Sequence, residues 1–186
     1  RGPERVWYGS AAASEYHDMD WLTRHINVGE DVHLRPLTND QTILVLAGPK
    51  ARDVLSACAR GDWSSDAFPW LSVRECFIGF APATVMGVSF SGELAYEIHV
   101  PNASLYAAYL ALRQAGKAHG LKLFGARAVE SMRMEKGFLH WKSEILTEFD
   151  PYETSLDRFV KLEKGDFIGR EALIERKKEG PLKKLV

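Results

Sequence analysis

Two β-prone runs flank a short turn in residues 84–100, and this segment constrains the fold more than any other part of the chain. The first run (84–88) is apolar, residues 91–93 are Ser-Gly-Glu, and the second run (95–100) is rich in aromatic and branched side chains. Aromatic and β-branched residues favour strands, whereas serine and glycine favour turns. The pattern therefore predicts a β-hairpin around which the rest of the chain forms a scaffold.

Glu97 is the acidic side chain of the second run. Because side chains alternate along a strand, Glu97 is expected on the same face as Ala95 and His99. Tyr96 and Ile98 are then expected on the opposite face, which is the better candidate for the core. Two interpretations of Glu97 remain open from this pattern alone: a carboxylate exposed to solvent, or a carboxylate in a functional site.

Length and composition describe an ordinary globular chain. At 186 residues it can bury a core, and it corresponds to one domain or to one domain with part of a neighbour. Hydrophobic residues make up 46% and charged residues 26%, which is typical of soluble proteins. The formal net charge of -1 gives no broad field that would attract nucleic acid or an anionic membrane, so neither partner is predicted. No apolar run approaches a membrane span, and no signal peptide is found.

The cysteines and histidines do not show the spacing of a metal site. Cys58 and Cys76 lack metal-ligand or CxxC spacing. They suit free thiols in a reducing compartment, namely the cytoplasm or, in a eukaryote, the mitochondrial matrix. His17 and His25 lie near acidic residues, but their spacing does not place ligands on one helix face. No metal site is therefore predicted.

Outside the hairpin, hydrophobic spacing predicts alternating strands and helices. Strands are expected at residues 6–8, 31–37, 41–47 and 72–81. Helices are expected from Ser14 to residues 27–29, after Gly48-Pro49, from Asn102 or Ser104 to Gly116 or Gly120, and from Gly125 to Gly137. This succession predicts an α+β fold of mostly antiparallel sheets flanked by helices.

Arg127 is expected in the first turn of the helix that begins near Gly125. A cation there opposes the helix macrodipole by a few tenths of a kcal/mol, unless an anion lies nearby. Arg127 is therefore either a surface arginine paired with Glu130 or a ligand for an anion. An unrelated enzyme that uses His140 and Glu144 as an acid-base pair is a further alternative, although this spacing is common on helix surfaces.

Four ordered sequence blocks carry a resemblance to a known family. They are GPKARDVL (48–55), GELAYE (92–97), GAR (125–127) with SMRMEKG (131–137), and DFIGREAL (166–173). Together they resemble the glycine-cleavage T-protein (aminomethyltransferase) family. The resemblance covers nearly the whole chain and extends in particular to the folate-binding region of dimethylglycine and sarcosine dehydrogenases. In those relatives the pairs His17-Asp18, Trp21-Leu22 and His140-Trp141 also have counterparts.

The resemblance implies a tetrahydrofolate site. The family's hairpin glutamate, here Glu97, accepts hydrogen bonds from the neighbouring N–H donors of the pterin, which suits an ionised carboxylate. The family's arginine at the Gly-Ala-Arg step, here Arg127, contacts the carboxylate-bearing tail of the folate. Phe90, at a position where relatives often carry tyrosine, and Trp141 are expected to line the space between them. The family's catalytic aspartate would fall before Arg1, so no catalytic residue is assigned within this chain.

The resemblance also implies a domain organisation and an activity. Residues 1–186 would form the central part of a folate-binding domain with ferredoxin-like subdomains, between the upstream catalytic segment and a C-terminal β-barrel domain. The expected function is tetrahydrofolate-dependent one-carbon transfer, joined to an FAD-containing domain that oxidises an N-methylated amino acid. The alternatives are a folate-binding regulatory or assembly protein without catalysis, and a structural domain that has lost its ligand. The amine substrate and the oligomeric state are not predicted.

Overall fold

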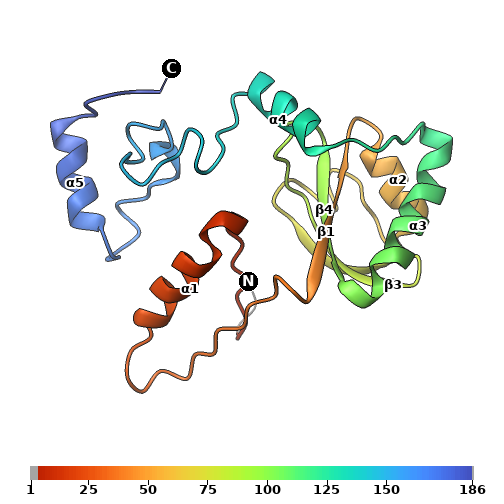
Figure 1. Ribbon diagram of the computed structural model, residues 1–186, viewed down its shortest axis with the longest axis horizontal. Coiled ribbons are helices and arrows are strands. Elements are labelled where there is room, and N and C mark those ends of the chain that lie inside the picture. The colour runs from red at the N-terminus through yellow and green to blue at the C-terminus, as the bar shows by residue number, and fades with distance from the viewer. Residues whose placement is uncertain (1–3, 186) are drawn as a thin grey trace. The chain divides into compact units, whose positions relative to one another are not determined.

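The computed structural model describes residues 4–185. The chain divides into two compact units, Arg1–Phe138 and Leu139–Val186, the second of which contains the last helix (Figure 1). The described residues form one four-stranded antiparallel sheet and five α-helices, which confirms the expected α+β class.

The sheet belongs to the first unit, and its strands follow the order β1-β4-β3-β2. The strands are β1 (Gln41–Ala47), β2 (Val73–Ile78), β3 (Ala81–Met86) and β4 (Ala95–Pro101). The predicted hairpin is confirmed, because β3 pairs with β4 in a register that sets Thr84 opposite His99 and Met86 opposite Glu97. The other side of β4 pairs with β1, so β4 lies inside the sheet with a partner on both sides.

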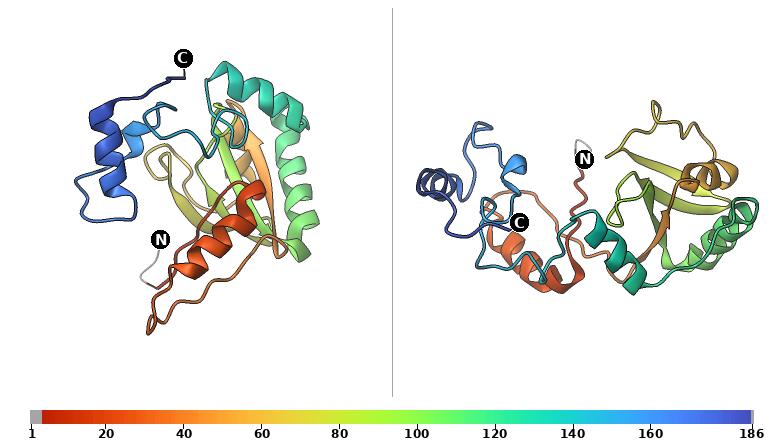
Figure 2. Two further views of the ribbon diagram at one scale, coloured as in Figure 1. Left: turned by 60° about the vertical axis from the view of Figure 1, so that its left-hand side comes forward. Right: turned by 90° about the horizontal axis from the view of Figure 1, so that it is seen from above.

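The core lies between one face of the sheet and two helices, α2 (Ala51–Cys58) and α3 (Leu105–Gly116), which cover the same side of the sheet in Figures 1 and 2. The predicted alternation of β4 is confirmed, because Tyr96, Ile98 and Val100 are buried with at most 2% of their surface exposed. Each fully buried aliphatic side chain of this kind contributes about 1.5–3 kcal/mol of hydrophobic stabilisation. The apolar face of β4 is therefore the centre of the first unit.

Several sequence predictions differ from the structure. No strand forms at residues 6–8 or 31–37, where the chain is irregular and largely exposed, because short runs cannot form strands without a pairing partner. The single strand expected at 72–81 is a β2–β3 hairpin, since Gly79 adopts a positive φ of 61° and reverses the chain. Helix α1 (Glu15–Arg24) ends earlier than expected, while α4 (Ala126–Glu135) lies within its predicted range.

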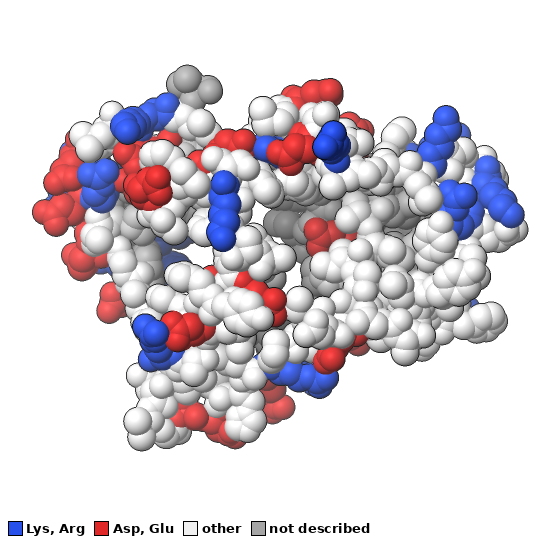
Figure 3. All heavy atoms as spheres, in the orientation of Figure 1, with Lys and Arg blue, Asp and Glu red and all other residues white. Residues whose placement is uncertain are grey.

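Figure 3 shows charged side chains of both signs on the drawn face, together with a broad uncharged area. None of the helices within residues 4–185 has the length and apolar character needed to cross a bilayer.

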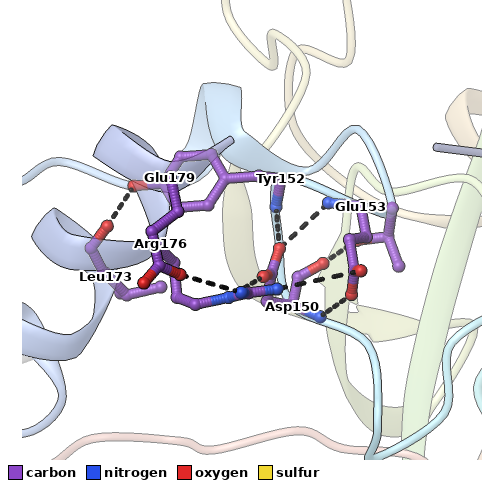
Figure 4. Close-up of polar contacts among 7 residues, drawn as sticks. Asp150, Tyr152, Glu153, Leu173, Arg176 and Glu179 are labelled. Carbon is purple, nitrogen blue, oxygen red and sulfur yellow. Dashed lines mark hydrogen bonds and ion pairs between the residues drawn. The ribbon is translucent and has the colours of Figure 1, made fainter. Parts of the chain in front are cut away.

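The second unit contains helix α5 (Arg170–Glu179), and a polar cluster joins it to residues 150–154 (Figure 4). Asp150 accepts hydrogen bonds from the backbone N–H groups of Tyr152 and Glu153 at 2.8 and 3.0 Å. The Arg176 Nε donates to the same carboxylate at 2.9 Å, and the Tyr152 hydroxyl donates to the Leu173 carbonyl at 3.1 Å. Partial burial disfavours the charged form of Asp150, but these hydrogen bonds outweigh it and hold the pKa below its usual value.

We expect Ile98→Ala to lower the free energy of unfolding by about 2–5 kcal/mol, because truncation of a side chain with no exposed surface leaves a cavity in the core. Ile43→Ala, on the opposite face of the same sheet and 49% exposed, is expected to cost less than about 1 kcal/mol. Denaturant unfolding monitored by circular dichroism measures both values. Equal losses in the two variants would show that the two faces of the sheet are packed alike.

Asp150→Asn should remove a pH-dependent part of the stability of the second unit. Because the folded pKa of Asp150 is lowered, its contribution is present above the unfolded pKa of about 3.9 and is lost as the pH falls through the folded value. Urea unfolding between pH 7 and pH 2, followed by the NMR signal of the Trp141 indole N–H, should give the wild type a higher free energy of unfolding than the variant at neutral pH, and this difference should shrink in acid. An advantage that is constant across this range would contradict the role given to the Asp150 carboxylate.

Candidate functional site

Glu97 lies on the sheet face opposite α2 and α3, so the outward orientation predicted from the sequence is confirmed. Its cross-strand neighbours are Val45 of β1 and Met86 of β3, and next to Val45 on this face lies Ile43. Val45 and Ile43 are 50% and 49% exposed, whereas the Glu97 side chain is 33% exposed. A carboxylate thus projects from an accessible, largely apolar surface.

His99 and Trp7 extend this surface on one side of Glu97. The His99 Nε2 lies 3.4 Å from a Glu97 carboxylate oxygen, and the Trp7 ring meets the His99 ring edge-on with centroids 6.1 Å apart. The sequence pattern placed His99 on the Glu97 face but gave it no role, and Trp7 was not connected with the site. The alternation along the strand was a usable signal for His99, whereas nothing in the sequence links Trp7 to β4.

Residues 87–94, which connect β3 to β4, hold Phe90 near the start of β4. Phe90 is 38% exposed. The connection turns at Gly92, where φ is +79°, and the Gly92 N–H donates to the Ser89 hydroxyl at 3.0 Å. A Cβ atom at Gly92 would overlap the aliphatic part of Lys136, so a side chain here would displace the residue that follows α4. This turn therefore requires glycine both for its backbone and for its packing.

Arg127 lies in the first turn of α4, as predicted, and its side chain is exposed. Among the described residues it makes no side-chain hydrogen bond or ion pair, whereas Glu130 accepts a hydrogen bond from the Arg133 Nε at 2.9 Å. The expected surface pair of Arg127 with Glu130 is therefore replaced by a pair of Glu130 with Arg133. The structure shows no contact between Arg127 and Glu97.

A groove of about 780 Å³ lies on the first unit between β1, α3, α4 and the segment 119–125. Its walls are mainly apolar and include Val45 and, from α4, Val129 and Met132. Val45 is also the cross-strand neighbour of Glu97, so the groove shares this residue with the surface around the carboxylate. A volume of this size falls in the range of small-molecule sites, about 300–1,000 Å³.

Trp141 belongs to the second unit. Its Nε1 atom is buried and has no hydrogen-bond partner among the described residues. The neighbouring pair His140 and Glu144 does not lie on a helix, because residues 139–145 form an irregular turn in which Glu144 accepts a hydrogen bond from the His140 backbone N–H at 2.8 Å. The interpretation of this spacing as a helix surface, which was the alternative to an acid-base pair, is therefore wrong.

The exposed pair His17 and Asp18, also singled out in the sequence, is connected in the structure. The His17 Nδ1 lies 3.0 Å from an Asp18 carboxylate oxygen, and the Tyr8 hydroxyl is 3.4 Å from the other oxygen. Hydrogen bonds from His17 and Ser10 lower the pKa of Asp18.

Within residues 4–185, no group of three or more metal-ligating side chains is placed to hold an ion. Cys58 and Cys76 are free thiols, and burial raises the pKa of Cys58 to about 11, so this thiol is a poor nucleophile. The described residues thus offer polar and apolar recognition groups rather than a metal centre or an activated thiol.

Comparison with known proteins gives a consistent result. Residues 1–164 match the family model described as the GCVT N-terminal domain. The chain is 35% identical over 179 residues to human mitochondrial dimethylglycine dehydrogenase, which covers 95% of this chain and 21% of that protein. It is 33% identical over 178 residues to the mouse mitochondrial pyruvate dehydrogenase phosphatase regulatory subunit, covering 95% of this chain and 20% of that protein.

Mouse mitochondrial sarcosine dehydrogenase is 35% identical over 150 residues, covering 80% of this chain and 16% of that protein. The chain thus spans about a fifth or less of the length of these relatives. The resemblance read from the four sequence blocks is confirmed by the family match, which extends over most of the chain. This chain belongs to the family of the GCVT N-terminal domain.

Proposed function

We propose that this chain is part of a tetrahydrofolate-binding domain that serves one-carbon transfer, and that Glu97 holds the pterin. The single observation that carries the proposal is the position of Glu97, a carboxylate projecting from an apolar face of the sheet that α2 and α3 leave uncovered. Tetrahydrofolate supplies the amine that accepts the one-carbon unit. The residues of this chain bind and orient that ligand.

The chemistry of Glu97 suits a pterin. The pterin presents a ring N–H and an exocyclic amino group side by side, and one ionised carboxylate can accept both hydrogen bonds. The flat ring requires apolar contacts, which Val45 and Met86 offer on either side of Glu97. His99, 3.4 Å from the carboxylate, limits its rotation and so favours one orientation toward the ligand.

The other predicted residues extend the proposed site toward the tail of the ligand. Arg127 is an exposed cation at a helix start, with its guanidinium not engaged by the described residues, and it suits the carboxylates of the folate tail. Phe90 and the apolar groove beside α4 supply nonpolar surface for the part between pterin and tail. Trp141, in the second unit, remains a predicted folate-contacting residue, and its buried indole N–H has no hydrogen-bond partner among the described residues.

In the complete protein we propose that the domain works beside an FAD-containing domain that oxidises an N-methylated amino acid. The names of the dimethylglycine and sarcosine dehydrogenase relatives support this assignment. The proton handling would belong to an aspartate upstream of Arg1. Residues 1–186 would form the central part of the folate-binding domain with ferredoxin-like subdomains, and a C-terminal β-barrel domain would follow. The cytoplasm or the mitochondrial matrix is the proposed compartment, as two of these relatives are named mitochondrial.

A second function is a folate-binding regulatory or assembly role without catalysis. The observation that favours it is the similarity to a protein named as a regulatory subunit of pyruvate dehydrogenase phosphatase. The two functions share ligand binding and differ in turnover. A protein that binds tetrahydrofolate and produces no methylene-tetrahydrofolate from an N-methylated amino acid would support the regulatory role.

Glu97→Gln should weaken tetrahydrofolate binding by about 1.5–3 kcal/mol, or roughly 10- to 150-fold in Kd, because the charge-assisted hydrogen bonds are lost. Calorimetric titration under reducing, oxygen-free conditions measures the affinity. The matched control is Glu75→Gln, since Glu75 is an exposed glutamate of β2 opposite Thr84 and away from β4. Unchanged affinity in a folded Glu97→Gln variant would remove this residue from the site.

Arg127 is tested with two ligands that differ only in the tail. Arg127→Gln should reduce the affinity for tetrahydrofolate by about 10-fold and leave the affinity for tetrahydropteroate, which lacks the glutamate, unchanged. Glu97→Gln should reduce both affinities, because both ligands carry the pterin. An equal loss for the two ligands in Arg127→Gln would show that Arg127 does not contact the glutamate tail.

A further inference from the structure

β1 is an edge strand of the sheet and lacks the charged side chains that usually protect such an edge. β4 pairs with one side of β1, and no strand among residues 4–185 pairs with the other side. Charged residues commonly protect exposed edges, because the unpaired backbone groups would otherwise pair with another chain. The opposite edge strand, β2, carries Arg74 and Glu75, whereas the seven residues of β1 (QTILVLA) include no charge. β1 is therefore the edge that is better suited to accept a further strand.

The register identifies the backbone groups that would pair with an added strand. The Gly48 N–H donates to the Leu94 carbonyl at 2.9 Å, which continues the pairing of β1 with β4. In an antiparallel pair, residues bonded to the partner strand alternate with residues whose backbone groups point to the other side. Counting back from Gly48, the backbone N–H and C=O groups of Ala47 and Val45 point away from β4. Neither residue makes a backbone hydrogen bond to the loops or helices among the described residues.

The groove described above runs along this free edge. Residues 44–47 of β1 line it, together with the segment 119–125 and with Val129 and Met132 of α4. Paired strands lie about 4.7–4.9 Å apart, so a strand added to β1 would enter the groove. Its side chains would then contact the apolar walls.

The charged side chains that line the groove are all basic. They are Lys50, immediately before α2, Arg113, in the last turn of α3, and Lys122, and His119 lies beside them in the lining. None of these four side chains makes a hydrogen bond or ion pair with the residues that the structure describes. No Asp or Glu lines the groove, and residues 98–129 contain neither. Unpaired cations around an apolar groove complement acidic groups on the molecule that fills it.

We propose that β1 binds an extended, acidic segment of a partner protein as a fifth strand of the sheet. Hydrogen bonds to the backbone of Val45 and Ala47 hold the segment, and its apolar side chains fill the groove. Lys50 follows Ala47 by three residues, so the acidic residues lie at the end of the segment beside Ala47. An uncharged edge alone would accept many strands, and the cations Lys50, Arg113 and Lys122 select an acidic one.

The site goes beyond the proposed folate function, which gives no role to these three cations or to the edge of β1. The folate and the segment would share only the nonpolar wall of the groove. The peptide titrations are therefore made without folate.

The test uses seven-residue peptides, blocked at both ends, in which valine and threonine alternate. Two acidic peptides carry a pair of glutamates at the N-terminal or the C-terminal end, which covers both strand directions. A lysine peptide replaces each glutamate pair. Titration of the isotope-labelled chain, followed by the NMR signals of the Val45 and Ala47 amides, measures Kd. An acidic peptide is expected to bind at least about 10-fold more tightly than its lysine counterpart.

N-methylation of the peptide separates strand addition from simple charge attraction. One form of the acidic peptide is methylated on one set of alternate amides, and a second form on the other set. Because only one set faces β1, one form should lose at least about 10-fold in affinity and the other should bind as the parent does.

Lys50→Gln combined with Lys122→Gln should weaken the acidic peptide at least about 10-fold, because two of the unpaired cations are lost. The matched control is Lys177→Gln combined with Lys178→Gln, which removes two exposed lysines of α5 in the second unit. This control should leave the Kd of the acidic peptide unchanged.

The proposal is overturned if neither acidic peptide shifts the signals of the folded chain, if the lysine peptides bind equally well, or if both N-methylated forms bind as the parent does. It is also overturned if the Val45 and Ala47 amides of the free chain exchange slowly with solvent, because the edge is then already covered. Sedimentation would assign that cover to a second copy if the chain is a dimer, or to the chain itself if it is a monomer. Failure here would leave the tetrahydrofolate titrations of the Glu97 and Arg127 variants unaffected, so the two proposals are tested separately.

Discussion

The alternation of side chains along β4 is the constraint on which the first unit depends. Ile98 and Val100 have no exposed surface and fix one face of this strand against α2 and α3, so Glu97 and His99 must lie on the other face. A slip of one residue in the pairing would bury the Glu97 carboxylate and expose Ile98, which is strongly unfavourable. The hydrophobic core thus sets the position of the polar surface residues.

Pairing on both sides makes β4 a rigid support for the proposed site. β1 and β3 each pair with it, and they bring Val45 and Met86 beside Glu97 from opposite directions. The connection that precedes β4 is held by the turn at Gly92, which packs against Lys136. Residues that recognise a ligand are more precisely placed on a paired strand than on a loop, because the strand loses little further freedom on binding.

The sequence predicted the elements whose signals are local and missed those that depend on distant partners. The bounds of β1 and the two faces of β4 followed from hydrophobic pattern, and the start of α2 followed from Gly48-Pro49. Strands at 6–8 and 31–37 were wrong because a β-prone run forms a strand only where another strand can pair with it. Trp7 approaches His99 through tertiary structure alone, and the pairing of Glu130 with Arg133 rather than Arg127 depends on side-chain geometry within α4.

Two neighbouring residues of β4 depart from simple core and surface rules in opposite ways. Glu97 places a charge on an apolar surface, and Tyr96 places inside the core a hydroxyl that has no hydrogen-bond partner among residues 4–185. A leucine or phenylalanine in place of Tyr96 would avoid the free-energy cost of an unpaired buried hydroxyl. A neutral polar residue in place of Glu97 would avoid the free-energy cost of a charge on an apolar surface. Positions where local rules fail while the surrounding structure is consistent are characteristic of function. Because the two side chains lie on opposite faces of one strand, Glu97 can meet a ligand, whereas the Tyr96 hydroxyl is closed off inside the core.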